Sequence, residues 1–351
     1  MKTLKYYTRK KRKKRKLRRQ ALRESGSHLK DLYRIYLENI NPITEPLVLI
    51  SQIQRSGGSF LSQLFDGHPE VHAHPHELKI GYPKKHIWPK LDLGEKPEKW
   101  FEILFEDSVI RLYKQGYKKD PTSVTIFPFI FLPSLQKKIF LKYLTSFDPP
   151  MMRDIFNAYM TSYFGAWLNN QNFCGPKKLI TAFTPRLSAI EENMEFFFNI
   201  YPDGRLISIV RDPKNWFPSA LRHNAKIKRT KYLDIEIALN QWNECAQAMI
   251  RNKNKYADKV CIIRFEDLIG KLESVARYLA GFLNIEFNPI LLKQTFNELP
   301  IEANTSFNPE DPGIMISTLS RYKTLSQEEL HTIEKKTGDT YRQVLEYTAR
   351  F

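Results

Sequence analysis

A glycine-rich turn separates the first apolar run of the chain from the first helical pattern. Residues 54–59 (QRSGGS) follow the run 46–53 (PLVLISQI) directly. Where a strand turns into a helix, free backbone N–H groups and the positive end of the helix dipole can bind an anion. The turn offers one positive charge, two hydroxyl groups and two glycines that let the backbone approach a phosphate. These residues are Arg55, Ser56, Gly57, Gly58 and Ser59. The G-x-x-x-x-G-K-[ST] pattern of a magnesium-dependent nucleotide site is missing, and an ordinary glycine turn is the structural alternative.

A second candidate anion site follows a later apolar run. Residues 205–210 (RLISIV) are typical of a buried strand, and Arg211 comes directly after it, at the sheet edge where open α/β proteins bind ligands. Asp212 is expected to cap the next helix, and Ser219 lies two turns further on. A guanidinium with a hydroxyl suits a phosphate separate from the first. In the alternative, Arg211 pairs with Asp212 or Glu266.

These segments, in this order, resemble the sulfotransferases that use 3′-phosphoadenosine-5′-phosphosulfate (PAPS). Residues 54–71 (QRSGGSFLSQLFDGHPEV) resemble the 5′-phosphosulfate loop of that family. Residues 206–223 (LISIVRDPKNWFPSALRH) resemble its 3′-phosphate motif, in which a Ser follows an Arg after eight residues, as Ser219 follows Arg211. Residues 262–285 resemble the strand and helix that come next, so the resemblance covers most of residues 46–345 outside an insertion.

The resemblance implies an enzyme that transfers a sulfuryl group from PAPS to a hydroxyl group without a metal. The acceptor would be a carbohydrate, a lipid, a small molecule or a protein tyrosine. The five turn residues would hold the 5′-phosphosulfate, Phe60 would lie near the adenine, and Arg211 with Ser219 would hold the 3′-phosphate. Residues 304–325 are similar to a late loop of the tyrosylprotein sulfotransferases, which adds Ser306 and Arg321 as donor-binding residues.

This sequence departs from the family pattern at three of these positions. Phe183 stands where relatives often carry Lys, so any contact made by that Lys is lost. Gly58 replaces a commoner Thr, which removes a hydroxyl donor, and Arg321 replaces a Lys.

A general base is expected in the segment that carries four ionisable side chains at residues 72–77. In relatives a Glu shortly after a D-x-H-P turn is the base, and Glu77 matches it with one extra residue in between. His76 is the second candidate, since a carboxylate or a neutral imidazole can each accept a proton near neutral pH. The same segment has a rival interpretation, a metal-dependent hydrolase that uses His72, His74 and His76 as ligands. The Asp of a compact HxHxDH pattern is missing here.

The surrounding pattern predicts an α/β fold with a mainly parallel central sheet flanked by helices and a P-loop-like phosphosulfate-binding loop. Strands are expected at 46–53, 179–183, 205–210 and 259–265, and helices at 29–37, 60–65, 151–171, 188–200, 213–222, 235–256 and 271–283. The helix at 188–200 is expected to begin with a capping box of Ser188 and Glu191. Residues at about 79–150 break the alternation and are predicted to form a helical, aromatic cap insertion. Its aromatic side chains would mainly form its own core, and some would line an acceptor pocket.

The net charge of +17 belongs mainly to one end of this chain of 351 residues. Residues 1–23 hold 13 of the 55 basic residues and no acid, so the remainder, with 42 basic and 38 acidic residues, is nearly neutral at +4. This predicts a basic, disordered tail and lead-in at residues 1–34, followed by one domain at 35–351. A passive, solubilising arm is the default interpretation of the tail, and contact with an anionic polymer or a membrane surface is the functional hypothesis. A non-enzymatic polyanion-binding protein is an alternative, but a nucleic-acid partner is not expected, because it would leave the Arg and Gly sites unused.

No targeting or spanning segment is recognised. The longest apolar stretch, residues 124–135, is interrupted by two prolines and is shorter than the ~20 residues that cross a bilayer. A cytoplasmic location is therefore expected. The cysteines are odd in number and far apart, which predicts buried thiols rather than disulfides; they are Cys174, Cys245 and Cys261.

Overall fold

The computed structural model describes residues 11–19, 28–80, 87–119, 124–226, 234–301 and 318–351. The chain forms two compact units, one helical and one α/β. The helical unit comprises Met1–Thr44, Lys79–Lys85 and Pro89–Phe173, and the α/β unit comprises Glu45–Leu78, His86–Trp88 and Cys174–Phe351.

A five-stranded parallel sheet forms the centre of the α/β unit. Its order is β2-β3-β1-β4-β5. The strands are β1 (Leu47–Ile50), β2 (Val71–Glu77), β3 (Leu179–Phe183), β4 (Arg205–Val210) and β5 (Val260–Arg264). All four residues of β1 are buried, as expected for a central parallel strand. The order reverses between β1 and β4, and such a switch point is where open parallel sheets bind ligands, beyond the carboxyl ends of the strands.

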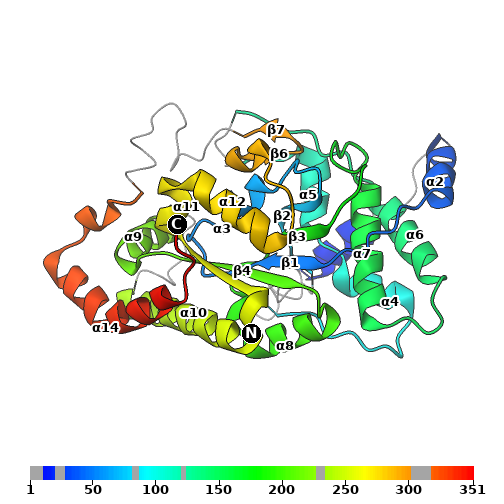
Figure 1. Ribbon diagram of the computed structural model, residues 1–351. Coiled ribbons are helices and arrows are strands. Elements are labelled where there is room, and N and C mark those ends of the chain that lie inside the picture. Colours follow the sequence, from blue (N-terminus) through cyan, green and yellow to red (C-terminus); the bar gives the residue numbers. More distant parts are fainter. Residues whose placement is uncertain (1–10, 20–27, 81–86, 120–123, 227–233, 302–317) are drawn as a thin grey trace. The chain divides into compact units, whose positions relative to one another are not determined.

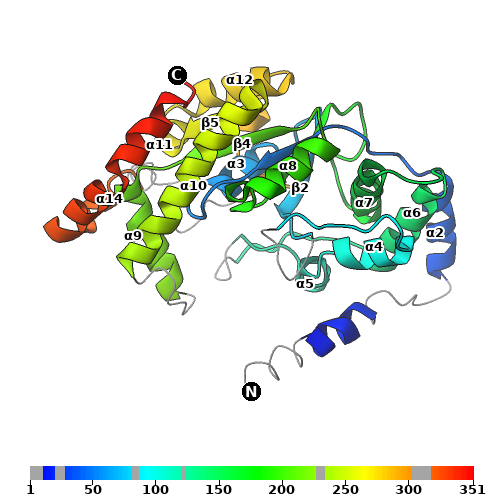
Figure 2. The same ribbon diagram turned by 90° about the horizontal axis from the view of Figure 1, so that it is seen from below.

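Helices cover both faces of this sheet. Helices α3 and α12 lie on one face, and α8 and α10 lie on the other (Figures 1 and 2). The helices of the unit are α3 (Gly58–Leu64), α8 (Glu191–Ile200), α9 (Pro213–Lys226), α10 (Ile235–Tyr256), α11 (Phe265–Gly270), α12 (Leu272–Leu283) and α14 (Gln327–Glu346). Short 3-10 helices lie at η1 (Leu187–Ala189), η2 (Ala257–Lys259), η3 (Pro289–Leu292) and η4 (Arg321–Thr324), and a small hairpin pairs β6 (Thr295–Phe296) with β7 (Leu299–Pro300). The predicted α/β fold with a mainly parallel sheet is confirmed.

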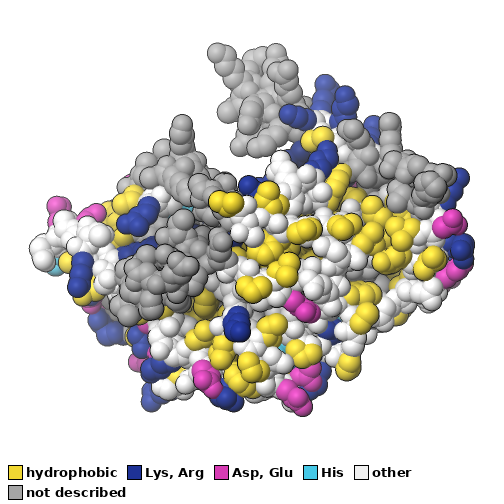
Figure 3. Space-filling view, turned by 90° about the horizontal axis from the view of Figure 1, so that it is seen from above, with side chains coloured by type: hydrophobic (Ala, Val, Ile, Leu, Met, Phe, Trp, Pro, Cys, Tyr) yellow, Lys and Arg dark blue, Asp and Glu magenta, His cyan; other side chains and the backbone are white. Residues whose placement is uncertain are grey.

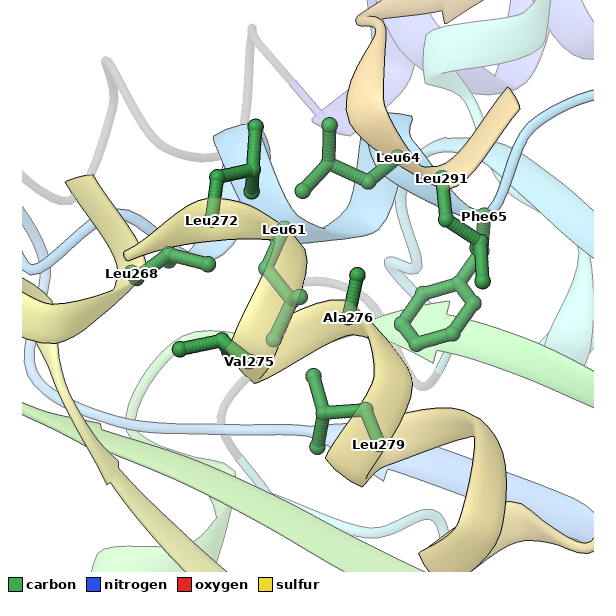
Figure 4. Close-up of a pocket in the computed structure, with 9 residues that line it drawn as sticks. All are labelled: Leu61, Leu64, Phe65, Leu268, Leu272, Val275, Ala276, Leu279 and Leu291. Atoms are coloured by element: carbon green, nitrogen blue, oxygen red, sulfur yellow. The ribbon is translucent and has the colours of Figure 1, made fainter. Parts of the chain in front are cut away.

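The core between α3, α11, α12 and η3 is closed and apolar. Side chains from these four elements point toward one another around a cavity of about 10 Å³ (Figure 4). They are Leu61, Leu64, Phe65, Leu268, Leu272, Val275, Ala276, Leu279 and Leu291. A space of this size holds about one water molecule at most, and its lining is apolar, so it is packed core rather than a ligand site. The packing holds α3, the helix that follows the glycine-rich turn, against α11, α12 and η3.

The helical unit contains α2 (His28–Glu38), α4 (Pro97–Leu104), α5 (Ser108–Gln115), α6 (Pro133–Leu144) and α7 (Met152–Ala166). Most aromatic side chains of the predicted insertion are buried in this unit, so they form its core; they include Trp100, Phe127, Phe129 and Phe131. Phe129 and Phe131 also line an open groove of about 450 Å³ together with Tyr113. Trp88 instead belongs to the α/β unit, where its backbone N–H donates to Asn193 Oδ1 at 2.8 Å.

Part of the basic N-terminal segment is helical. Residues 11–19 form a helix, and Arg18 donates to Asp107 Oδ1 at 3.0 Å and to the Glu102 carbonyl at 2.7 Å within the helical unit. Residues 1–10 and 20–27 lie outside the described residues. The lead-in helix expected at 29–37 is present as α2.

Among the described residues, no helix combines the length and the apolar character needed to cross a bilayer. The cytoplasmic location stays a prediction. On the face drawn in Figure 3, Lys and Arg side chains occur in several separate groups.

Two local expectations from the sequence are wrong. Helix α8 begins at Glu191 and its N-cap, Ile190, offers no side-chain acceptor, so the predicted capping box does not form. Ser188 instead donates two hydrogen bonds to Ser51, just after β1: its backbone N–H donates to Ser51 Oγ at 3.0 Å, and its Oγ donates to the Ser51 carbonyl at 3.1 Å. Cys174 is exposed, whereas Cys245 and Cys261 are buried as predicted.

Candidate functional site

The glycine-rich turn runs from the carboxyl end of β1 into α3. Arg55 and Gly57 both have positive φ, 70° and 90°, and this alternation lets successive backbone N–H groups face one anion. A Cβ atom on Gly57 would lie 2.7 Å from the ring of Phe265, so only glycine fits there. Ser56 is fully buried, and its Oγ has no hydrogen-bond partner within the described part of the chain, whereas Ser59 is exposed. The turn therefore has a backbone conformation that can direct N–H groups toward an anion, and a buried hydroxyl that can bind it.

Arg211 lies directly after β4 and contacts the turn. Its Nη1 donates to the Arg55 carbonyl at 2.8 Å, and its Nη2 donates to the Thr318 carbonyl at 2.9 Å. The guanidinium lies over the Phe265 ring, 4.3 Å from its centre, and the side chain is only 3 % exposed. Among the described residues its Nε has no acceptor. The side chain is thus held in place with donor capacity to spare.

Several arginines are crowded at this edge of the sheet. Burial is the main reason that the pKa of Arg211 falls to about 9; the charges of Arg321 and Arg55 lower it further, while Glu266 opposes them. Burial also lowers the pKa of Arg321 to about 10, with the charges of Arg222 and Arg55 adding to the effect. The guanidinium groups of Arg211 and Arg321 are still protonated at neutral pH. Buried like charges are costly unless an opposite charge joins them, so this edge of the sheet favours an anion.

Helix α9 carries the second candidate anion site. It begins as expected, because Asp212 Oδ1 accepts from the Lys214 N–H at 2.8 Å. The Trp216 indole donates to the Gln54 carbonyl at 2.8 Å and so ties the helix to the turn. Ser219 is 2 % exposed, and the described residues offer its Oγ no partner. A buried hydroxyl without a partner costs about 1–3 kcal/mol, a cost that a ligand oxygen would remove.

The alternative was that Arg211 pairs with Asp212 or Glu266, but both of its Nη atoms donate to carbonyl oxygens. Glu266 Oε1 accepts a hydrogen bond from the Asp212 backbone N–H at 3.1 Å. Burial is the main cause that raises the pKa of both carboxyl groups.

The candidate bases lie at the end of β2. Glu77 is partly buried and pairs in register with Phe183, the last residue of β3. His76 Nδ1 is 3.0 Å from the Glu77 carbonyl, and His74 Nδ1 is 2.8 Å from the His76 carbonyl. His72 is 2 % exposed, and burial lowers its pKa to about 3, so it is a neutral core side chain. Because parallel strands end at one edge, Glu77 and His76 lie at the same edge of the sheet as the turn and Arg211.

The three other predicted donor-binding residues lie in η4, in the apolar core and outside the described part of the chain. Arg321 begins η4, and the next residue is tied to α9 because the Tyr322 N–H donates to Asn215 Oδ1 at 3.2 Å. Phe60 is 7 % exposed and belongs to the apolar core of α3. Ser306 lies outside the described residues.

Some residues at this edge were not found from the sequence. Gln52 is 2 % exposed, and neither polar atom of its side chain has a partner among the residues that the structure describes. One signal was available, since Gln52 is a large polar residue at the end of a mainly apolar strand pattern. Trp216 and Phe265 had no such signal, because an aromatic residue in an apolar pattern is typical of any core.

Residues 132–289 match the family model described as "Sulfotransferase family". The matched segment includes Arg211 and Ser219. The resemblance inferred from the motifs is thereby confirmed, as is the enzyme class, a sulfotransferase that transfers a sulfuryl group. The metal-dependent hydrolase and the non-enzymatic polyanion-binding protein are not favoured.

Solved structures of several sulfotransferases overlap in part with this one. The sulfotransferase domain from the curacin biosynthetic pathway is 17 % identical, with 85 % of this chain and 99 % of that chain covered and a TM-score of 0.46. The sulfotransferase domain of the Synechococcus PCC 7002 olefin synthase is 16 % identical, with 82 % and 97 % covered and a TM-score of 0.48. A sulfotransferase from Alicyclobacillus acidocaldarius is 14 % identical, with 84 % and 96 % covered and a TM-score of 0.42. No curated protein matches the sequence.

Proposed function

We propose that this sulfotransferase uses PAPS as its donor and transfers the sulfuryl group to a hydroxyl-bearing acceptor. One observation carries the proposal: Arg55, Arg211 and Arg321 interact at the switch point of the sheet, where two buried serine hydroxyls have no partner among the described residues. An ordinary glycine turn with an exposed arginine would have none of these features. Two anion-binding segments without a magnesium motif suit a donor with phosphates at two positions.

The donor is assigned to the site residue by residue. Residues 55–59 would hold the 5′-phosphosulfate, and Arg211 with Ser219 would hold the 3′-phosphate. When bound, PAPS supplies an activated sulfuryl group, and transfer leaves negative charge on the 5′-phosphate. Arg55 and the N–H groups of the turn would stabilise that charge, because they are oriented before the reaction begins. Arg321, Ser306 and Phe60 stay proposed donor-binding residues on the resemblance alone.

Glu77 is proposed as the general base that takes the proton of the acceptor hydroxyl. Its place at the carboxyl end of β2 supports this role, since the phosphate-binding residues follow the carboxyl ends of β1 and β4. His76 is the second candidate. We expect Glu77→Gln to abolish turnover while leaving donor binding nearly unchanged. If Glu77→Gln keeps full turnover and His76→Gln loses it, the role passes to the imidazole.

The acceptor is proposed to be a carbohydrate, a lipid, a small molecule or a protein tyrosine. The basic N-terminal segment would raise the local concentration of an acceptor that is anionic or lies on an anionic surface.

Calorimetry with adenosine 3′,5′-bisphosphate tests the donor assignment. The wild type should bind it, and Arg211→Met should weaken binding about 100-fold, because two or more charge-assisted hydrogen bonds are lost. Arg205 is a matched control: it begins the same strand at the opposite edge, and its guanidinium also lies over a phenylalanine, 5.5 Å from the Phe282 ring centre. Arg205→Met should bind like the wild type. Absence of binding by the folded wild type would refute the proposal.

A further inference from the structure

Gln52 is a buried amide at the carboxyl end of the central strand. Its backbone carbonyl accepts from the Arg186 N–H at 2.9 Å, so the main chain is satisfied there. Its side chain is 2 % exposed, and both Nε2 and Oε1 are buried with no partner among the described residues. Each buried polar group left without a hydrogen bond costs about 1–3 kcal/mol, which is rarely tolerated in a core without a ligand or another compensation.

The amide lies against the glycine-rich turn. A Cβ atom built on Gly58 would overlap the Gln52 amide nitrogen and the edge of the Phe183 ring, and it would lie 2.9 Å from Gln52 Cδ. Gln52 and Phe183 therefore fill the space that any side chain at residue 58 would need. The glycine at position 58 is a requirement of this packing, and the amide takes the place where a side chain at 58 would begin.

We propose that Gln52 is a donor-binding residue whose side-chain N–H donates a hydrogen bond to an oxygen at the 5′ end of the donor. A primary amide offers two donors, and neither is used by the described part of the protein. The 5′ end is assigned because the amide contacts Gly58, inside the turn, whereas Arg211 and Ser219 follow β4. The inference rests on the proposed function and adds a residue that the turn motif does not contain.

The test uses two ligands that differ only at the 5′ position. Calorimetry compares adenosine 3′,5′-bisphosphate with adenosine 3′-monophosphate for the wild type and for Gln52→Leu, which keeps the volume and removes both polar atoms. We expect Gln52→Leu to bind the bisphosphate about 10-fold more weakly and the monophosphate as the wild type does. Gln52→Glu, of nearly the same shape but anionic, should bind the bisphosphate still more weakly.

Thermal unfolding without ligand separates binding from a structural role. Gln52→Leu should melt at the wild-type temperature or above, because two unpartnered buried polar atoms are removed. Adding the bisphosphate should raise its melting temperature less than it raises that of the wild type. Gln63→Leu is the matched control: Gln63 lies in α3 and is 8 % exposed, and its Oε1 accepts from Gln294 Nε2 at 2.9 Å. That variant should melt lower and bind both ligands normally.

The outcomes distinguish the two proposals. A wild type that binds neither ligand refutes the PAPS assignment, and the inference with it. A wild type that binds the bisphosphate, with Gln52→Leu and Gln52→Glu equally tight, overturns the role of Gln52 alone. Equal weakening for both ligands, or a lower melting temperature without ligand, would show that the amide is structural.

Discussion

Replacing Gly58 by alanine tests the packing of the turn with a single methyl group. Gly58 is the first residue of α3 and its φ lies outside the left-handed region, so the backbone itself accepts alanine. Helix propensity alone would favour the change. The new Cβ would overlap the Gln52 amide and the Phe183 ring, so both would have to move.

Overpacking of this kind costs about 1–3 kcal/mol. For a unit of this size, about 2 kcal/mol lowers the melting temperature by roughly 5 °C. The control is Gly281→Ala: Gly281 lies in α12, and a Cβ atom there would have nothing within 4 Å. That substitution should gain up to about 1 kcal/mol from helix propensity and raise the melting temperature by about 2 °C.

Thermal unfolding followed by circular dichroism measures both changes in melting temperature. Gly58→Ala should lower the melting temperature and Gly281→Ala should raise it. Gln52→Ala combined with Gly58→Ala should recover part of the loss, since the amide is gone and the Phe183 ring remains. If Gly58→Ala stabilises the protein as Gly281→Ala does, the Gln52 amide does not pack closely against Gly58. The argument for the amide as a donor-binding group then fails.

Three further predictions concern other parts of the chain. Burial of the His72 imidazole, with the charge of Lys177 adding, lowers its pKa from 6.5 to about 3, so the unfolded chain takes up this proton first and stability falls as the pH drops below 6.5. In urea denaturation, lowering the pH from roughly 6.5 to 4.5 should reduce the free energy of unfolding of the wild type by about 2 kcal/mol more than that of His72→Gln, and equal pH slopes would contradict this. Trp216→Phe removes the hydrogen bond to the Gln54 carbonyl and should weaken the binding of adenosine 3′,5′-bisphosphate about 5-fold. Unchanged affinity would mean that this hydrogen bond does not order the turn. Replacing the eight basic residues 9–16 by Gln should leave turnover of a small neutral acceptor unchanged and abolish salt-sensitive retention on a polyanion column; a loss of turnover would place the segment at the site.

The arrangement of strand, turn and helix could be predicted from the sequence because its signals are local. An apolar run followed by QRSGGS contains both the strand and the reason that it ends. The long helix at Ile235–Tyr256 was predicted with the same bounds, since its apolar spacing continues without a break until the chain turns. Arg211 was identified in the same way, from its position directly after a buried strand.

The contacts that complete the candidate site join segments far apart in the chain. The capping box expected at Ser188 failed because Ser51, at the end of β1, offered that side chain a partner that no local pattern shows. Arg211 was visible in the sequence, but its hydrogen bonds to the Arg55 and Thr318 carbonyls were not.

The sequence by itself determined the order of strands and helices, the position of the turn and the identity of its charged residues. The tertiary structure alone decided which side chains share the space around the turn. Gln52, Gly58 and Phe183 are acceptable separately in any parallel sheet, and only the pairing of β1 with β3 in register brings them into contact. The physical reason is that spacing along the chain encodes local backbone conformation, whereas packing depends on residues that meet only when the sheet forms.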